Sequence, residues 1–248
     1  MTRAARDETT TTDTTLGTPP GTPAAPDGVE LPDWLRPVAH AAASLRPGQL
    51  SRFLPPADGA GRESAVLILF GDGAAPGEPP RPELLLMERA GTLRSHAGQP
   101  SFPGGSLDPE DGDPAGPGPV RAALREAEEE TGLDPAGVAV FGVLPRLYIP
   151  HSGFVVSPVL GWWHTRSPIT AVDPGETARV FTVPVADLAD PANRVTAIHP
   201  NGHTGPAFEV ASALVWGFTA GLIDRILHHA HWERPWDTSR RVPLDSRA

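Results

Sequence analysis

Hydrophobic residues along this chain gather in short runs that are separated by segments rich in Gly and Pro. The runs over residues 64–70 (SAVLILF) and 84–89 (LLLMER) predict two strands of one sheet. Three further strands are predicted downstream, over residues 138–147, 155–163 and 180–185. The runs VTAIH and AFEV flank Asn201-Gly202, a turn dipeptide that favours a β-hairpin.

Apolar residues at helical spacing predict three helices, over residues 31–43, 120–131 and 214–229. In the first helix Trp34, Leu35 and Val38 share one side, although Pro37 blurs its start. The last helix is carried by the apolar residues Leu214, Phe218, Leu222 and Ile226. Strands outnumber helices, so the pattern predicts an α+β fold, or an α/β/α sandwich with a mixed sheet.

The length of 248 residues is compatible with one domain and two ragged ends. Residues 1–28 contain almost no large apolar side chain and are predicted to be a disordered tail. The domain is predicted over residues 29–235, followed by a C-terminal tail over residues 236–248.

The net charge of -10 argues against nucleic-acid or anionic-membrane partners, because both require an excess of cationic side chains. An anionic small molecule would need a local basic patch or a metal ion. The absence of cysteine excludes disulfides, thiolate metal sites and cysteine nucleophiles. No run approaches the roughly 18 apolar residues of a membrane helix, and the first residues lack the apolar core of a signal peptide, so a cytoplasmic location is expected.

The segment PVRAALREAEEETGL forms the most informative helix, with Pro119 in its first turn and Gly132 as a C-terminal cap. Glu126, Glu129 and Glu130 fall within about 100° of one another around this helix. Like charges at this spacing cost roughly 0.2–0.5 kcal/mol per pair. A hard divalent cation such as Mg²⁺, which prefers carboxylate oxygens, explains them.

A plainer interpretation stays open at this point. The acidic face of the helix is equally well a solvated surface, with Arg125 and Glu129 as an ordinary ion pair four residues apart. Glu128 points elsewhere and is expected to be a surface acid.

The same helix resembles a known family. The run from Arg125 to Leu133, REAEEETGL, is similar to the end of the Nudix box, and Gly104-Gly105 resembles the glycine pair that opens the box. The intervening 19 residues form a longer loop than in the general box. Pro117 stands where the general box has Glu, so the role of that Glu is absent or passes to one of four loop acids. These acids are Asp108, Glu110, Asp111 and Asp113.

The resemblance implies a Nudix-type α/β/α sandwich in which Glu126, Glu129 and Glu130 hold Mg²⁺ or Mn²⁺. A metal-bound water would attack a phosphorus of a diphosphate, and Arg125 would orient one of the glutamates. Glu176 is an outside candidate for ligand or general base, although a surface Glu before a strand is the plainer interpretation.

The segment before the box resembles the coenzyme A diphosphatase branch of the family. Arg89, Ala90, Arg94, Gly98 and Phe102 to Gly105 stand in register with its signature, whereas Met87 replaces the usual Thr. The run 216–220 (WGFTA) also resembles that branch. The resemblance implies hydrolysis of coenzyme A or its thioesters to 3′,5′-ADP and 4′-phosphopantetheine.

Two arginines beside a diphosphate suit an additional phosphate, such as the 3′-phosphate of coenzyme A. Pairing with acids such as Glu88 is the structural alternative for Arg89 and Arg94. His96 either contacts phosphate or caps the loop, and the predicted substrate-binding set also includes Gly104 and Gly105. Packing roles are expected for the following aromatic residues and proline: Phe102, Pro103, Trp162, Trp163, Trp216 and Trp232.

Two rival functions and the oligomeric state stay open. The same fold would serve NADH, ADP-ribose or a nucleoside triphosphate as the small-molecule nucleotide substrate, or would bind a nucleotide without turnover as a sensing module. The sequence leaves open whether the chain forms a homodimer.

We expect deletion of residues 1–28 to leave turnover and melting temperature nearly unchanged, because their composition predicts no packed contacts. Comparison of the truncated and full-length proteins by calorimetry and activity assay checks this. A large drop in either quantity would show that the segment docks on the domain.

Overall fold

The computed structural model describes residues 28–92 and 97–244. These residues form one eight-stranded and one four-stranded sheet. The strands of the large sheet are β1 (Arg62–Asp72), β2 (Pro82–Arg89), β3 (Pro100–Ser101), β4 (Gly104–Ser106), β5 (Val138–Val143), β6 (Leu147–Ile149), β7 (Phe154–Trp163) and β8 (Thr177–Pro184). Those of the small sheet are β9 (Arg194–Ile198), β10 (Thr204–Val210), β11 (Ala213–Val215) and β12 (Arg241–Pro243). The α-helices are α1 (Arg36–Ser44), α2 (Pro47–Leu50), α3 (Gly118–Thr131), α4 (Val185–Ala189) and α5 (Gly217–His229).

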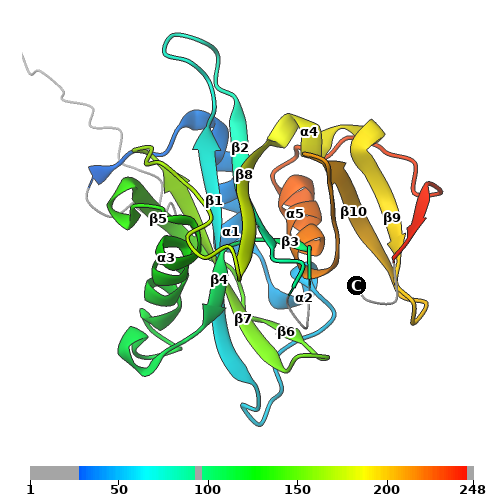
Figure 1. The fold of residues 1–248 in the computed structure, drawn as a ribbon, viewed down its shortest axis with the longest axis horizontal. Helices are drawn as coiled ribbons and strands as arrows, with labels where there is room; N and C mark the ends of the chain where they lie inside the picture. The colour runs from blue at the N-terminus through cyan, green and yellow to red at the C-terminus, as the bar shows by residue number, and fades with distance from the viewer. Residues whose placement is uncertain (1–27, 93–96, 245–248) are drawn as a thin grey trace, which may run out of the picture.

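The large sheet is mixed. Its strands follow the order β3-β2-β1-β7-β5, with β4 also paired to β1, β6 to β7 and β8 to β2. Strands β1 and β7 are parallel, whereas β1 and β2 are antiparallel. Helix α3 lies on one side of this sheet, and α5 with the small sheet lies on the other (Figure 1). The layers confirm the predicted α+β fold class.

Alternation along β1 supplies both faces of the large sheet. Leu67 and Leu69 pack beneath α3, whereas Ile68 and Phe70 face the larger cluster that includes α1 and α5. All four side chains are fully buried. A strand buried on both faces reads as a continuous apolar run, and SAVLILF is such a run.

Most predicted elements are confirmed, including the hairpin of β9 and β10, in which Gly202 adopts a φ of 84°. Two element boundaries were wrong. The predicted strand over 138–147 is divided between β5 and β6. Leu214 lies in β11 and pairs with Glu209, so the last helix begins only at Gly217. Within the predicted C-terminal tail, Arg241–Pro243 form β12 and pair with β9. The predicted N-terminal tail lies outside the described residues except for Gly28.

A buried arginine joins the small sheet to α5 and to the segment that follows it. Arg194 on β9 is fully buried and pairs with Asp224 of α5 and, at 3.3 Å, with Glu233. Its guanidinium also lies 4.6 Å from the ring centroid of Trp236. Arg225 is a second partner of Asp224, with Nε 3.0 Å from the carboxylate. The interior of this part of the fold therefore contains one buried positive charge, that of Arg194, which two acidic side chains neutralise.

Among the described residues, no helix combines the length and the apolar character needed to cross a bilayer.

We expect Asp224→Ala to lower the free energy of unfolding by about 3 kcal/mol, because it leaves Arg194 buried with an incomplete set of partners. Arg225→Ala is the control, because Arg225 is partly exposed and its loss should cost less than about 1 kcal/mol. Urea denaturation of both variants measures the difference. Equal losses would show that the buried charge is not the source of the effect.

Candidate active site

Helix α3 lies against the backbone of a glycine pair at the start of β4. The amide of Gly104 donates a hydrogen bond of 2.9 Å to the carboxylate of Glu130. A Cβ atom at Gly104 would overlap the carbonyl oxygen of Ala65, and a Cβ atom at Gly105 would overlap the carboxylate of Glu126. The absent side chain of Gly105 therefore makes room for Glu126, whereas that of Gly104 allows the close approach of β1 and leaves its amide to bind Glu130.

Arg125 is the centre of the polar contacts on α3. Its Nη1 donates to Glu126 at 3.0 Å and to Glu129 at 3.1 Å. Its Nη2 donates to Asp111 at 2.9 Å and to the carbonyl oxygen of Ser106 at 3.1 Å. Arg125 is thus placed to orient either Glu126 or Glu129, as predicted. Its contact with Glu129 is also the ion pair between residues four apart that the simpler interpretation expects.

The long loop between β4 and α3 supplies a third acidic partner of Arg125, Asp111. Asp111 is buried, and its hydrogen bond to Arg125 lowers the pKa of the Asp111 carboxyl. Asp108 approaches Arg125 only to 3.6 Å. Asp113 instead accepts a hydrogen bond from the amide of Ala115. Of the four loop acids, Asp111 therefore makes the closest contact with the arginine of α3.

The three glutamates differ in their exposure to solvent. Burial raises the pKa of Glu130 to about 7, even though the amide of Gly104 stabilises the charged form. Burial also raises the pKa of Glu126, against the opposing effect of Arg125. The side chain of Glu129 is 59% exposed. Two of the three carboxylates thus carry a desolvation cost that a cation would relieve.

Arg89, at the end of β2, and Glu176, in the turn before β8, both act on the same site. Both influence the pKa of Glu130 electrostatically, Arg89 lowering it and Glu176 raising it. The carbonyl oxygen of Glu176 also accepts a hydrogen bond of 2.8 Å from the amide of Ala90. The structural alternative for Arg89, an ion pair with Glu88, is not formed, since Glu88 binds Arg179 at 2.7 Å. Within the described ranges Arg89 has no ion-pair partner.

Comparison of the sequence with models of known protein families shows which family the chain belongs to. The family model described as the NUDIX domain matches residues 62–200, more than half of the 248-residue chain.

The chain belongs to the Nudix family.

The match to relatives within the family covers most of the length of each relative. An uncharacterized Nudix hydrolase, NudL, from Cronobacter sakazakii is 41% identical over 151 residues, which cover 58% of this chain and 73% of the relative. NudL from Escherichia coli is 38% identical over 169 residues, covering 65% and 79%. A crystal structure of the Nudix hydrolase RenU from M. smegmatis is 18% identical, with a TM-score of 0.43, and covers 69% of this chain and 87% of that one. The chain is therefore a Nudix hydrolase, a diphosphatase, and nucleotide-type small molecules are typical substrates of such enzymes.

The remaining predicted Nudix site residues divide into two groups. Arg94 and His96 lie outside the described residues. Phe102 packs in the core, as do the tryptophans expected to do so. Sequence reasoning missed the segment after β7, where the amide of Thr170 donates to the carbonyl oxygen of Thr131 at 2.9 Å. This contact caps the end of α3, and no local motif announces it.

The side-chain types on α3 fit a hard divalent cation. Three carboxylates on one helix face supply oxygen ligands, and Gly105 leaves room for that of Glu126. In the described part of the chain, however, no three acidic or histidine side chains already converge as a metal cluster. The reason is visible in the contacts: Arg125 holds Glu126 and Glu129. These carboxylates would turn away from Arg125 to bind an ion.

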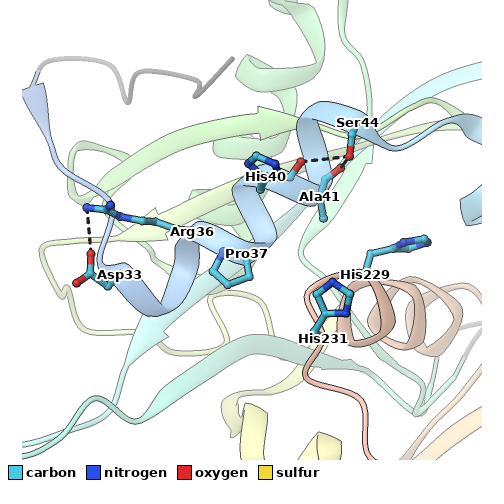
Figure 2. A pocket seen from close by; sticks show the side chains of 8 residues that line it. All are labelled: Asp33, Arg36, Pro37, His40, Ala41, Ser44, His229 and His231. Carbon is cyan, nitrogen blue, oxygen red and sulfur yellow. Dashed lines mark hydrogen bonds and ion pairs between the residues drawn. The ribbon is translucent and has the colours of Figure 1, made fainter. Parts of the chain in front are cut away.

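A hollow of about 510 Å³ lies elsewhere, between α1 and the end of α5 (Figure 2). Its walls include His40, His229 and His231. Burial, together with nearby His228 and Arg225, lowers the pKa of His229. No predicted Nudix site residue lines this hollow, so it is distinct from the candidate active site.

We expect Glu130→Gln to lower turnover at saturating Mg²⁺ by at least about 100-fold. The amide of glutamine still accepts the hydrogen bond from Gly104, so the fold should be retained. Circular dichroism and steady-state kinetics measure the two effects separately.

Glu128→Gln is the matched control, because Glu128 is exposed on the same turn of α3. It should keep near-native turnover. Near-native turnover of Glu130→Gln, or an equal loss in the control, would contradict the assignment of the site.

Proposed function

We propose that this Nudix hydrolase cleaves the diphosphate of coenzyme A or its thioesters. Water breaks one P–O–P anhydride bond and the products are 3′,5′-ADP and 4′-phosphopantetheine, or its acyl derivative. The observation that carries the proposal is Arg89 at the end of β2. Its guanidinium lies within electrostatic reach of Glu130, yet within the described part of the chain it pairs with no acid.

The sequence context of Arg89 supports coenzyme A over other nucleotides. Arg89, Gly98 and the run 102–105 match the coenzyme A diphosphatase signature, and Arg94 is the second arginine of that signature. A guanidinium without an acidic partner beside a diphosphate site is suited to a further phosphate group. Coenzyme A carries such a group at its 3′ position.

The residues of α3 are assigned to the metal-dependent part of the reaction. Glu126, Glu129 and Glu130 are the proposed ligands of Mg²⁺ or Mn²⁺, and the ion, when bound, offsets charge on the diphosphate oxygens and makes water more acidic. Arg125 binds Glu126 and Glu129, which would exchange this contact for the ion, whereas the amide of Gly104 holds Glu130. Which carboxylate accepts the proton of the attacking water stays open, with Glu176 among the candidates.

A panel of diphosphates tests the substrate directly. Purified protein is incubated with Mg²⁺ or Mn²⁺ and with coenzyme A, dephospho-coenzyme A, NADH, ADP-ribose or a nucleoside triphosphate, and the products are identified by mass. The proposal requires coenzyme A to give 3′,5′-ADP with the highest specificity constant. Preference for any other member of the panel rejects it.

We expect Arg89→Ala and Arg94→Ala to lower kcat/KM for coenzyme A by about 10- to 100-fold, the effect of a lost charge-assisted contact. Dephospho-coenzyme A, which lacks the 3′-phosphate, should lose far less. Kinetics of both substrates with both variants make the comparison.

Two other outcomes have distinct meanings. Equal losses on both substrates reject the assignment of these arginines to the 3′-phosphate, since they would then act on the diphosphate or on the charge of Glu130. Loss of stability before loss of activity would show a structural role.

A further inference from the structure

Two residues paired across β2 and β8, beside the candidate active site, each have a buried polar atom without a hydrogen-bond partner in the described part of the chain. The two atoms are Nε of Arg89 and Oγ1 of Thr177. Thr177 is only 1% exposed. Buried polar atoms in proteins are nearly always hydrogen-bonded to protein or to ordered water, so two neighbouring exceptions call for a shared explanation.

A strand irregularity sets these two residues opposite each other. In the antiparallel pairing of β2 with β8, Glu88 stands opposite Arg179, and regular pairing would then place Ala178 opposite Arg89. The register shifts at this point, and Thr177 stands opposite Arg89 instead. Such bulges redirect side chains and are frequent next to active sites. The bulge therefore replaces a methyl group by a hydroxyl group opposite the arginine.

Both side chains lie on the face of the sheet that α3 covers. Leu85 packs in the cluster beneath α3, and Arg89 follows it on β2 by an even number of residues. Directly opposed residues of an antiparallel pair point to the same face. The influence of Arg89 on Glu130 of α3 agrees with this placement.

The two orphan groups have complementary chemistry. Nε–H of arginine is a donor, and a threonine hydroxyl both donates and accepts. Because the two atoms do not bind each other, a single oxygen atom between them satisfies both. The guanidinium would then be fixed through Nε, and its two Nη groups would stay available to a phosphate.

We propose that Thr177 is a positioning residue for Arg89: its hydroxyl and Nε of Arg89 share one ordered water molecule, which holds the guanidinium toward the substrate. The inference rests on the proposed function only in taking Arg89 as a substrate-binding residue. It requires a phosphate-bearing substrate, and not coenzyme A in particular.

The kinetic test uses whichever diphosphate the wild-type enzyme cleaves best, so that failure of the coenzyme A assignment leaves it intact. Thr177→Val removes the hydroxyl at nearly constant volume and should raise KM about tenfold with kcat nearly unchanged. Thr177→Ser keeps the hydroxyl and should behave as wild type. Thr182→Val, on the same strand opposite Leu85, is the matched control and should be silent.

A double variant separates action through Arg89 from an independent effect. In the Arg89→Ala background, Thr177→Val should add no further loss, because the group that it positions is gone. Independent, multiplying losses overturn the proposal. So does a Thr177→Val enzyme with wild-type KM, or a Thr177→Ser enzyme as defective as Thr177→Val.

Hydrogen exchange provides a readout that needs no substrate. In protein labelled with ¹⁵N-arginine, the Nε–H signal of Arg89, assigned by its loss in Arg89→Lys, should exchange slowly in wild type and Thr177→Ser. It should exchange faster in Thr177→Val. Fast exchange in the wild-type protein overturns the proposal by itself, so the test stands even if the valine variant fails to fold.

Discussion

The approach of α3 to the backbone of Gly104 and Gly105 is the constraint on which the site depends. At these two positions any side chain would overlap Ala65 or Glu126. The contact brings a backbone amide to Glu130 and leaves space at Glu126. It also leaves Glu126 and Glu130 partly buried, a placement that disfavours their charged forms. Close packing thus makes the charged carboxylates unfavourable by themselves, and a divalent cation or a neighbouring guanidinium can stabilise them.

Two arginines lie on different sides of this contact. On one side Arg125 connects Glu126 and Glu129 with buried Asp111, so the helix is tied to the long loop that precedes it. On the other side Arg89 lacks an acidic partner in the described residues. Arg125 lies within 4 Å of four carboxylates and is held in place by them, whereas Arg89 forms no ion pair with a described acid and influences Glu130 only from a longer distance. This difference is the reason why we propose a substrate-binding role for Arg89 and an architectural role for Arg125.

Local patterns predicted the features that depend on local sequence. Pro119 and Gly132 predict the ends of α3, and helical periodicity predicts that its three glutamates share one face. Features that depend on non-local pairing were missed. Leu214 continues the apolar spacing of a helix, yet it pairs with β10. Asp111 meets Arg125 across a loop of unpredictable path. Thr177 faces Arg89 only because of a bulge, which no pattern in either strand announces.

We propose that the acidic face of α3 binds the catalytic divalent ion. Titration of Mn²⁺ into the metal-free protein, with free Mn²⁺ followed by electron paramagnetic resonance, tests it without reference to any substrate. The account predicts saturable binding that is strongly weakened by Glu126→Gln and unchanged by Glu128→Gln, since Glu126 faces the glycine pair and Glu128 faces solvent. Equal Mn²⁺ affinity in wild type and Glu126→Gln would contradict it.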